Sequence, residues 1–198
     1  MKSKFWLQCA CFGLCFASLS GTALAQKFEV HPYATLANAT KWNDFQDVRT
    51  SGLYGARGGV FLTRSLEVEG NFGVMNHFEF ENVATKARGI LWDVNGVYNY
   101  FSSNIPRLVP YVTAGIGGVT TVNLSTPLTF TALGREYRWE NRDTFFGFNY
   151  GAGLKGLRLS GPFGIRGDVR GRTLPNVFGR KVLWFEGTFG IDFTWGER

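Results

Sequence analysis

Apolar and polar residues alternate along nearly the whole chain from residue 27 onward, and this alternation restricts the possible folds more than any other feature. The clearest run covers residues 66–74, where Leu, Val, Gly, Phe and Val occupy one phase and Glu, Glu, Asn and Gly the other. The pattern recurs in residues 90–100, 163–170 and 185–195. Successive side chains of a β-strand point to opposite faces, whereas helical spacing fits none of these runs. The sequence therefore predicts an all-β fold.

Eight segments of 10–13 residues show this pattern: residues 27–36, 52–62, 66–78, 88–100, 108–119, 144–156, 163–172 and 183–195. Strands of soluble domains have about 5–6 residues, whereas a tilted strand that crosses a bilayer needs roughly 9–11. Long connections (37–51, 79–87, 120–143 and 173–182) alternate with short ones (63–65, 101–107 and 157–162). This predicts an eight-stranded antiparallel up-and-down transmembrane β-barrel with short periplasmic turns and long extracellular loops.

The first 25 residues are typical of a cleaved secretory signal. Lys2 and Lys4 precede an apolar run over residues 5–19, and Ala23-Leu24-Ala25 offers a peptidase small side chains. The predicted domains are therefore a signal peptide at residues 1–25 and a barrel at residues 26–198. The chain's three cysteines all lie in the leader, so no disulfide is expected in the mature barrel.

Ten charged residues share the polar phase of the predicted strands. They are Arg57, Glu67, Glu69, Asp93, Lys155, Arg166, Asp168, Arg170, Glu186 and Asp192. The interior of an eight-stranded barrel is only just wide enough for side chains, and buried charges are tolerated when they are paired. We expect these residues to form a lumen charge network that fills the barrel and blocks conduction. A narrow porin-like channel is the alternative for the same residues.

Alternation alone also fits a secreted lipocalin-like ligand carrier, whose apolar face points inward. Strand length favours the membrane barrel. Aromatic residues near the predicted strand ends also favour it, since such residues form girdles at membrane interfaces. They are Tyr33, Phe78, Tyr100, Phe101, Tyr111, Phe145, Trp184 and Trp195.

Three segments carry a resemblance to a known family: Gly-Gly-Val-Phe at 58–61, Val-Pro-Tyr-Val-Thr-Ala-Gly-Ile-Gly-Gly at 109–118, and Gly-Ile-Asp-Phe-Thr-Trp at 190–195. They resemble the small, OmpA-like outer-membrane β-barrel domains. The resemblance implies an outer-membrane location, contact with membrane lipid and lipopolysaccharide, and a structural or surface-interaction role. It also implies a C-terminal signal for the barrel insertion machinery, formed here by Phe189, Ile191, Phe193 and Trp195.

No catalytic, cofactor or metal site is expected. Residues 151–156 match the dinucleotide spacing G-x-G-x-x-G, but no helical pattern follows them. His31 and His77 are the two histidines, and neither begins a zinc motif. Some barrels of this size are lipid A-modifying enzymes, so His77 beside Glu79 and Glu81 keeps that function as an alternative.

The basic residues argue against one partner class and suggest another. Lys and Arg are spread along the chain and do not gather in one patch, which argues against nucleic acid. The predicted long loops nevertheless combine basic and aromatic residues: Lys86, Arg135, Arg138, Arg142, Arg180 and Lys181 with Trp42, Phe45, Tyr137, Trp139 and Phe178. Such loops are suited to lipopolysaccharide phosphates or to another extracellular ligand.

Overall fold

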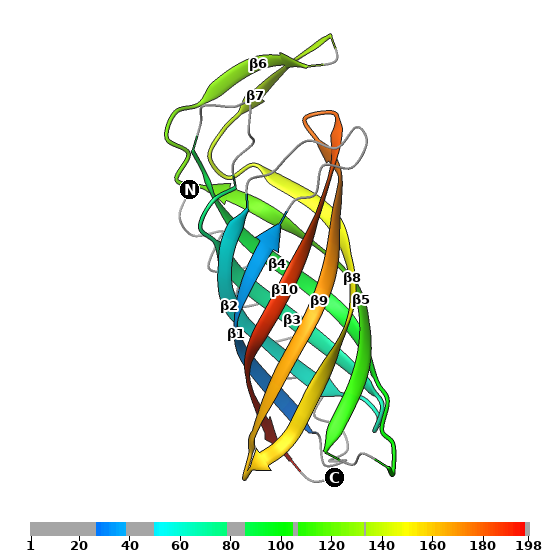
Figure 1. Cartoon of the computed structure of the whole chain (residues 1–198). Helices are drawn as coiled ribbons and strands as arrows, with labels where there is room; N and C mark the ends of the chain where they lie inside the picture. Colours follow the sequence, from blue (N-terminus) through cyan, green and yellow to red (C-terminus); the bar gives the residue numbers. More distant parts are fainter. Residues whose placement is uncertain (1–26, 39–49, 79–85, 105–106, 133, 197–198) are drawn as a thin grey trace, which may run out of the picture.

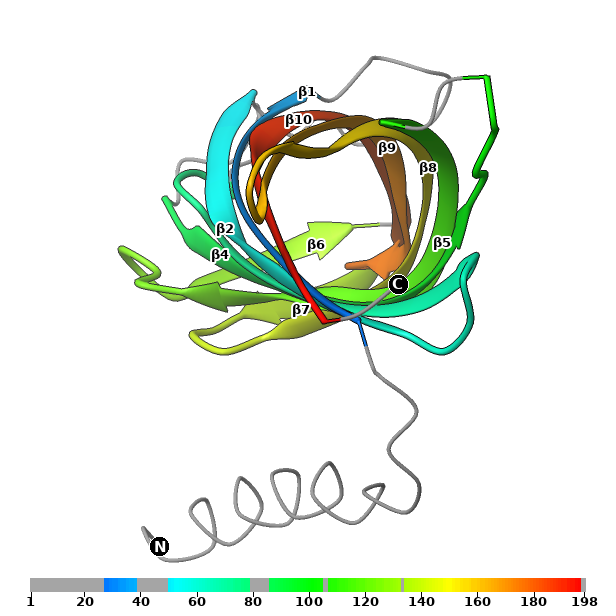
Figure 2. The ribbon, with the colours of Figure 1, turned by 90° about the horizontal axis from the view of Figure 1, so that it is seen from below.

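The computed structural model describes residues 27–38, 50–78, 86–104, 107–132 and 134–196. Eight antiparallel strands close into a barrel in the order β1-β10-β9-β8-β5-β4-β3-β2 (Figures 1 and 2). They are β1 (Phe28–Asn38), β2 (Ser51–Phe61), β3 (Leu66–Met75), β4 (Arg88–Asn99), β5 (Leu108–Val122), β8 (Thr144–Ser160), β9 (Phe163–Val177) and β10 (Arg180–Trp195). The predicted fold is confirmed. The predicted signal peptide lies outside the described residues.

The long-loop end contains more regular structure than the sequence predicted. Part of the expected loop 120–143 forms a separate hairpin of β6 (Leu128–Ala132) and β7 (Arg135–Trp139), which projects from the barrel in Figure 1. β9 and β10 also extend through most of the expected loop 173–182 and meet at a tight turn. At the other end, β8 continues to Ser160, into the expected turn 157–162. Runs as short as β6 and β7 give too little alternation to be distinguished from a loop.

The outer wall of the barrel is apolar. Four large apolar side chains on this wall expose 58–66% of their surface: Phe72, Ile116, Phe146 and Phe189. In β4, every second residue is buried and points into the barrel. Such a continuous apolar exterior suits lipid and would be a liability in water. The inward apolar face of a lipocalin-like carrier is therefore not what the structure shows. Among the described residues, no helix is long and apolar enough to cross a membrane.

The interior has two zones. Charged side chains fill the middle and the short-turn end, whereas an apolar cluster fills the long-loop end. Six barrel strands contribute to that cluster through Leu53, Met75, Leu91, Val119, Leu174 and Val182, all at most 2% exposed.

This apolar zone corrects the aromatic prediction. Five of the eight proposed girdle residues point inward and are buried: Tyr33, Phe78, Tyr111, Phe145 and Trp184. Tyr100 and Trp195 are exposed, at 61% and 48%, and Phe101 is half-buried. The prediction failed because position near a strand end does not determine which way a side chain points. Tyr33, Phe145 and Trp184 are each an even number of residues from a lumen charge of their own strand, so alternation places them on the inner face.

Candidate functional site

The most distinctive part of the molecule is the charged lumen. The structure places all ten predicted residues inside the barrel, none more than 6% exposed. Two further charged residues join them, Glu29 at 2% and Arg172 at 0% exposure. The sequence prediction omitted both. Glu29 nevertheless lies an even number of residues from His31 and Tyr33, on the same face of the strand, and Arg172 continues the every-second-residue series of charges at positions 166, 168 and 170. Seven acidic residues thus meet five Lys and Arg residues in the described lumen.

Near the short-turn end, Lys155 and Arg166 connect acids from opposite strands. Lys155 Nζ lies 2.7 Å from both Glu29 Oε1 and Glu67 Oε2. Arg166 Nη1 lies 3.0 Å from Glu29 Oε1 and 2.7 Å from Glu69 Oε2. Each cation therefore binds two carboxylates, and each pair joins β8 or β9 to β1 or β3 across the lumen.

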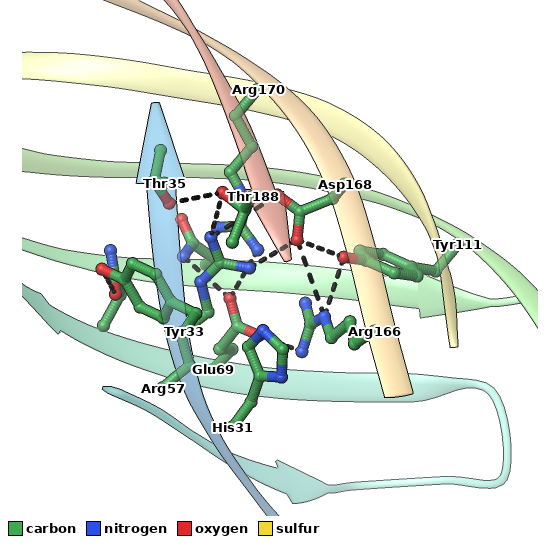
Figure 3. Close-up of polar contacts among 12 residues, drawn as sticks. His31, Tyr33, Thr35, Arg57, Glu69, Tyr111, Arg166, Asp168, Arg170 and Thr188 are labelled. Atoms are coloured by element: carbon green, nitrogen blue, oxygen red, sulfur yellow. Dashed lines mark hydrogen bonds and ion pairs between the residues drawn. The ribbon is translucent and has the colours of Figure 1, made fainter. Parts of the chain in front are cut away.

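Asp168 is the centre of the middle cluster (Figure 3). Its carboxylate accepts hydrogen bonds from Arg57 Nη1 at 2.5 Å, from Tyr111 OH at 2.5 Å and from Arg170 Nε at 3.2 Å. Arg170 Nη2 also donates to Glu69 Oε1 at 2.9 Å, which links this cluster to the one below. Charge-assisted bonds of this kind are shorter and stronger than neutral ones.

Arg172 organises the upper cluster, next to the apolar zone. It donates to Asp93 Oδ2 at 2.8 Å and to Glu186 Oε1 at 2.9 Å. Trp184 Nε1 donates to the same Glu186 oxygen at 2.7 Å, and Asn71 Nδ2 donates to Asp93 Oδ2 at 2.9 Å. Among the residues that the structure describes, Arg172 is the one cation paired with either of these acids.

Inward glycines on β5 and β8 make room for the charged side chains opposite them. A Cβ at Gly117 would lie 2.4 Å from Asp93 Cβ. A Cβ at Gly153 would lie 2.6 Å from Asp168 Cβ and 2.7 Å from Tyr111 Cζ. All three distances are shorter than real Cβ contacts, so any larger residue would displace the network.

Asp192 is held less firmly than the other lumen acids. The ion-pair contact that the structure gives it is with His31 Nδ1, at 3.8 Å. His31 Nδ1 also lies 3.1 Å from the carbonyl oxygen of Ile191, and since a carbonyl can only accept, Nδ1 carries the proton. Among the described residues, Asp192 therefore has no direct pairing with Arg or Lys, in contrast to the neighbouring lumen acids.

Aromatic rings cover the lumen at the long-loop end. Phe178, in the β9–β10 turn, packs its ring 5.1 Å from Phe145 and 5.6 Å from Trp139 of β7. Phe78 lies 6.0 Å from Phe145 and 6.5 Å from Trp184. We call these five residues the aromatic lid. Phe178 holds a φ of 53°, a conformation that costs a bulky residue about 1–3 kcal/mol, so its ring is placed there against local backbone preference.

The residues proposed for other roles lie elsewhere. His77 is exposed, and its backbone N–H donates to Ser51 Oγ at 2.9 Å, while Ser51 Oγ donates to the Gly52 carbonyl at 3.1 Å. Glu79 and Glu81 lie outside the described residues. Within the described part of the chain, no three His, Cys, Asp or Glu residues are grouped to hold a metal. Of the proposed insertion signal, Phe189, Ile191 and Trp195 are exposed on the outer wall, and Phe193 stacks on Trp195 at 5.9 Å.

Comparisons with known proteins agree with this architecture. A family model described as the outer membrane protein β-barrel domain matches residues 11–192. Among solved structures, Pseudomonas aeruginosa OprG is 10% identical, with a TM-score of 0.61 over 89% of this chain and 99% of that one. Neisserial surface protein A is 10% identical, with a TM-score of 0.58 over 85% and 96%. The N-terminal barrel domain of Pseudomonas aeruginosa OprF is 20% identical, with a TM-score of 0.53 over 85% and 97%.

At these identities the solved structures show a shared fold alone. A search of curated protein sequences finds no match. The family model, in contrast, covers most of the chain. The chain therefore belongs to the outer membrane protein β-barrel domain family and is a protein of the bacterial outer membrane.

Proposed function

We propose that this protein is a non-enzymatic outer-membrane barrel with a structural or surface-interaction role and a lumen that does not conduct ions. The observation that carries the proposal is the filled interior. In the described part of the barrel, twelve charged side chains occupy the lumen, and the aromatic lid and the apolar cluster fill its long-loop end. An eight-stranded barrel leaves little space beyond its own side chains.

Two different barriers oppose ion flow. In the middle of the barrel, an ion would have to separate pairs such as Arg57 with Asp168 and Arg170 with Glu69. At the long-loop end it would have to lose its water among Phe78, Phe145 and Trp184, all at most 7% exposed. Removing an ion from water without replacing its ligands is very costly. A gate would therefore have to move both the charged and the apolar zone.

Planar-bilayer recording of the refolded mature barrel tests the closed lumen. We expect no steady single-channel current from the unmodified protein. A variant that removes one barrier, such as Phe178→Gly, should stay closed, because the charged zone remains. Steady, large currents from the unmodified protein would refute the proposal and favour the porin-like alternative.

The non-enzymatic part of the proposal is supported by the surroundings of His77. The nearby Ser51 hydroxyl is 2% exposed and is engaged with backbone groups, so it is poorly placed to act as a nucleophile. Purified barrel should release no fatty acid from lipid A. Release that disappears in the His77→Ala variant would favour the enzyme instead.

We also propose that the long loops face the cell exterior and bind an anionic surface ligand. Family barrels place their short turns in the periplasm, which puts the β6–β7 hairpin and the β9–β10 turn outside. Arg135, Arg138 and Arg180 are exposed there, and Arg138 pairs with Glu140 at 2.6 Å. A structurally similar protein, Yersinia pestis Ail, has been solved with the heparin analogue sucrose octasulfate. Binding of that compound to this barrel, and its loss in Arg135→Gln/Arg180→Gln, tests the proposal.

The end of β10 is proposed as the signal for the barrel insertion machinery. Phe189, Ile191 and Trp195 expose 48–63% of their surface, so the insertion machinery could contact them from outside the barrel. Replacing Phe193 and Trp195 with Ala should slow machinery-assisted insertion more than spontaneous refolding in detergent. Equal slowing of both would indicate a structural effect and contradict the signal.

A further inference from the structure

The outer wall over β4, β5 and β8 changes from apolar to basic within three rows of residues. Cross-strand pairing sets the rows: Trp92, Gly118 and Phe146 form the lowest, and Ile90, Thr120 and Thr144 form the next. Above them, Arg88 pairs with Val122, and the backbone N–H of Arg142 donates to the Thr121 carbonyl at 2.8 Å. Successive rows are about 7 Å apart along a strand.

The lowest row is an aromatic platform formed by Trp92 and Phe146. Trp92 lies edge to face with Phe146, with ring centroids 5.7 Å apart and an interplanar angle of 86°. Gly118 permits this arrangement, since a Cβ there would lie 3.2 Å from the Trp92 ring. Aromatic rings with a polar edge are typical of the membrane interface. Here the polar edge points to the row above, because Trp92 Nε1 donates to Thr120 Oγ1 at 3.3 Å.

The middle row offers a hydroxyl donor. Thr120 and Thr144 share one hydrogen bond, with their Oγ1 atoms 2.9 Å apart. Two hydroxyl groups carry two protons, and the bond between them uses one. The hydrogen bond from the Trp92 N–H occupies a lone pair of Thr120 Oγ1 and does not use a hydroxyl proton of the threonine pair. Whichever threonine donates, one O–H of the pair remains to donate to an outside acceptor.

The upper row adds unpaired positive charge. Arg88 and Arg142 are exposed, and neither has an acidic partner among the described residues. The acids of the adjoining turn are engaged otherwise: Glu140 pairs with Arg138, and Asp143 Oδ2 accepts from the Glu140 backbone N–H at 2.8 Å. Arg88 and Arg142 lie on opposite sides of β5, about 10 Å apart at two strand spacings.

We propose that Arg88, Arg142 and the Thr120–Thr144 pair bind the phosphate groups of lipid A, the phosphorylated glycolipid of the outer leaflet. Arginine forks and a hydroxyl donor match the oxygens of a phosphate ester. The two arginines suit a headgroup with a phosphate at each end. The Trp92–Phe146 platform below takes the first part of the acyl chains. This site lies on the outer wall and is independent of the lumen.

Native mass spectrometry of the full mature barrel, titrated with bisphosphorylated lipid A, tests the proposal. Hydrogen bonds to charged groups are strong enough that each arginine should contribute about tenfold to the affinity. We expect Arg88→Gln and Arg142→Gln each to weaken binding by about that factor. The matched control Arg64→Gln/Arg107→Gln removes two exposed arginines at the opposite, short-turn end of the barrel and should leave the affinity unchanged.

Measurements on the unmodified barrel keep the test valid if a variant folds poorly. Monophosphorylated lipid A should bind about tenfold more weakly than the bisphosphorylated form, and phosphatidylglycerol more weakly still. Equal affinity for all three lipids would overturn the proposal by showing general attraction to anionic lipid. Displacement of lipid A by an equal concentration of inorganic phosphate, or equal losses in the control and the site variants, would overturn it as well.

Discussion

Replacing Arg172 with methionine should destabilise the barrel more than any other single change in the lumen. Arg172 is fully buried and pairs with Asp93 and Glu186 at 2.8 and 2.9 Å. Without it, Glu186 keeps the Trp184 N–H and Asp93 keeps the amides of Asn71 and Asn95, but neither acid keeps a paired cation. Breaking a buried ion pair lowers the free energy of unfolding by about 3–5 kcal/mol. Because Arg172→Met leaves two buried acids without a cation, we expect its loss to be at or above the upper limit, about 5 kcal/mol.

Arg166→Met provides the internal comparison. Arg166 also binds two acids closely, but Glu29 keeps Lys155 at 2.7 Å and Glu69 keeps Arg170 at 2.9 Å. Its loss should therefore cost about 3 kcal/mol, the lower limit for a buried pair. The exposed Arg138→Met is the control, since a surface pair contributes about 0–1 kcal/mol.

Urea unfolding of the barrel in lipid vesicles, followed by tryptophan fluorescence, measures these free energies. Adding Asp93→Asn and Glu186→Gln to Arg172→Met should recover most of the loss, because amides keep hydrogen bonds without charge. Unfolding of Arg172→Met at the same urea concentration as Arg138→Met would show that the ion pairs of Arg172 do not stabilise the barrel. If the triple variant does not regain stability, the loss in Arg172→Met comes from poorer packing and not from unpaired buried charge.

Three further predictions concern other parts of the chain. Phe189→Arg places a charge on the lipid face and should cost about 2–4 kcal/mol, against about 0–1 for Trp195→Arg at the interface; equal costs in vesicle unfolding would contradict the depth of Phe189. Phe178→Gly removes a buried ring but relieves a positive φ, for a net loss of about 2 kcal/mol. Hydrogen exchange in residues 135–139 should accelerate in that variant, and unchanged exchange would mean that the ring does not hold the hairpin. Finally, the mass of the protein from outer membranes should correspond to a chain that begins at Gln26; a mass that includes the leader would contradict cleavage after Ala25.

Residue parity explains what could be predicted from the sequence. Charged and apolar residues alternate in β3, β9 and β10, so the face of each side chain followed from its position, and all ten expected lumen charges are buried. Parity says nothing about height along the barrel. The aromatic lid was missed for this reason: Phe145 and Trp184 have inward parity but lie where the polar lining gives way to an apolar one.

The ion pairs themselves could not be predicted. Arg57 meets Asp168 across 111 residues of sequence, and Arg172 meets Asp93 across 79. These partners lie on strands that are not neighbours in the ring, so they depend on the tilt and stagger of the closed barrel. Alternation within single strands contains no information on either quantity. The contact between Trp92 and the Thr120–Thr144 pair could not be predicted either, because the register between strands brings these residues together.

The long-range pairing in the lumen has a consequence for how the barrel assembles. Strands β1–β4 carry four of the lumen acids, Glu29, Glu67, Glu69 and Asp93, with Arg57 as their single cation, whereas β8 and β9 carry the other four cations. The β1–β4 half would therefore expose an excess of three negative charges to the hydrocarbon, whereas β8–β10 hold their four cations beside three acids, Asp168, Glu186 and Asp192. The four acids of β1–β4 pair with cations of β8 and β9 when the first and last strands meet and the ring closes. Closure should be a single cooperative event, and two separately produced halves should be insoluble alone yet complement each other when mixed.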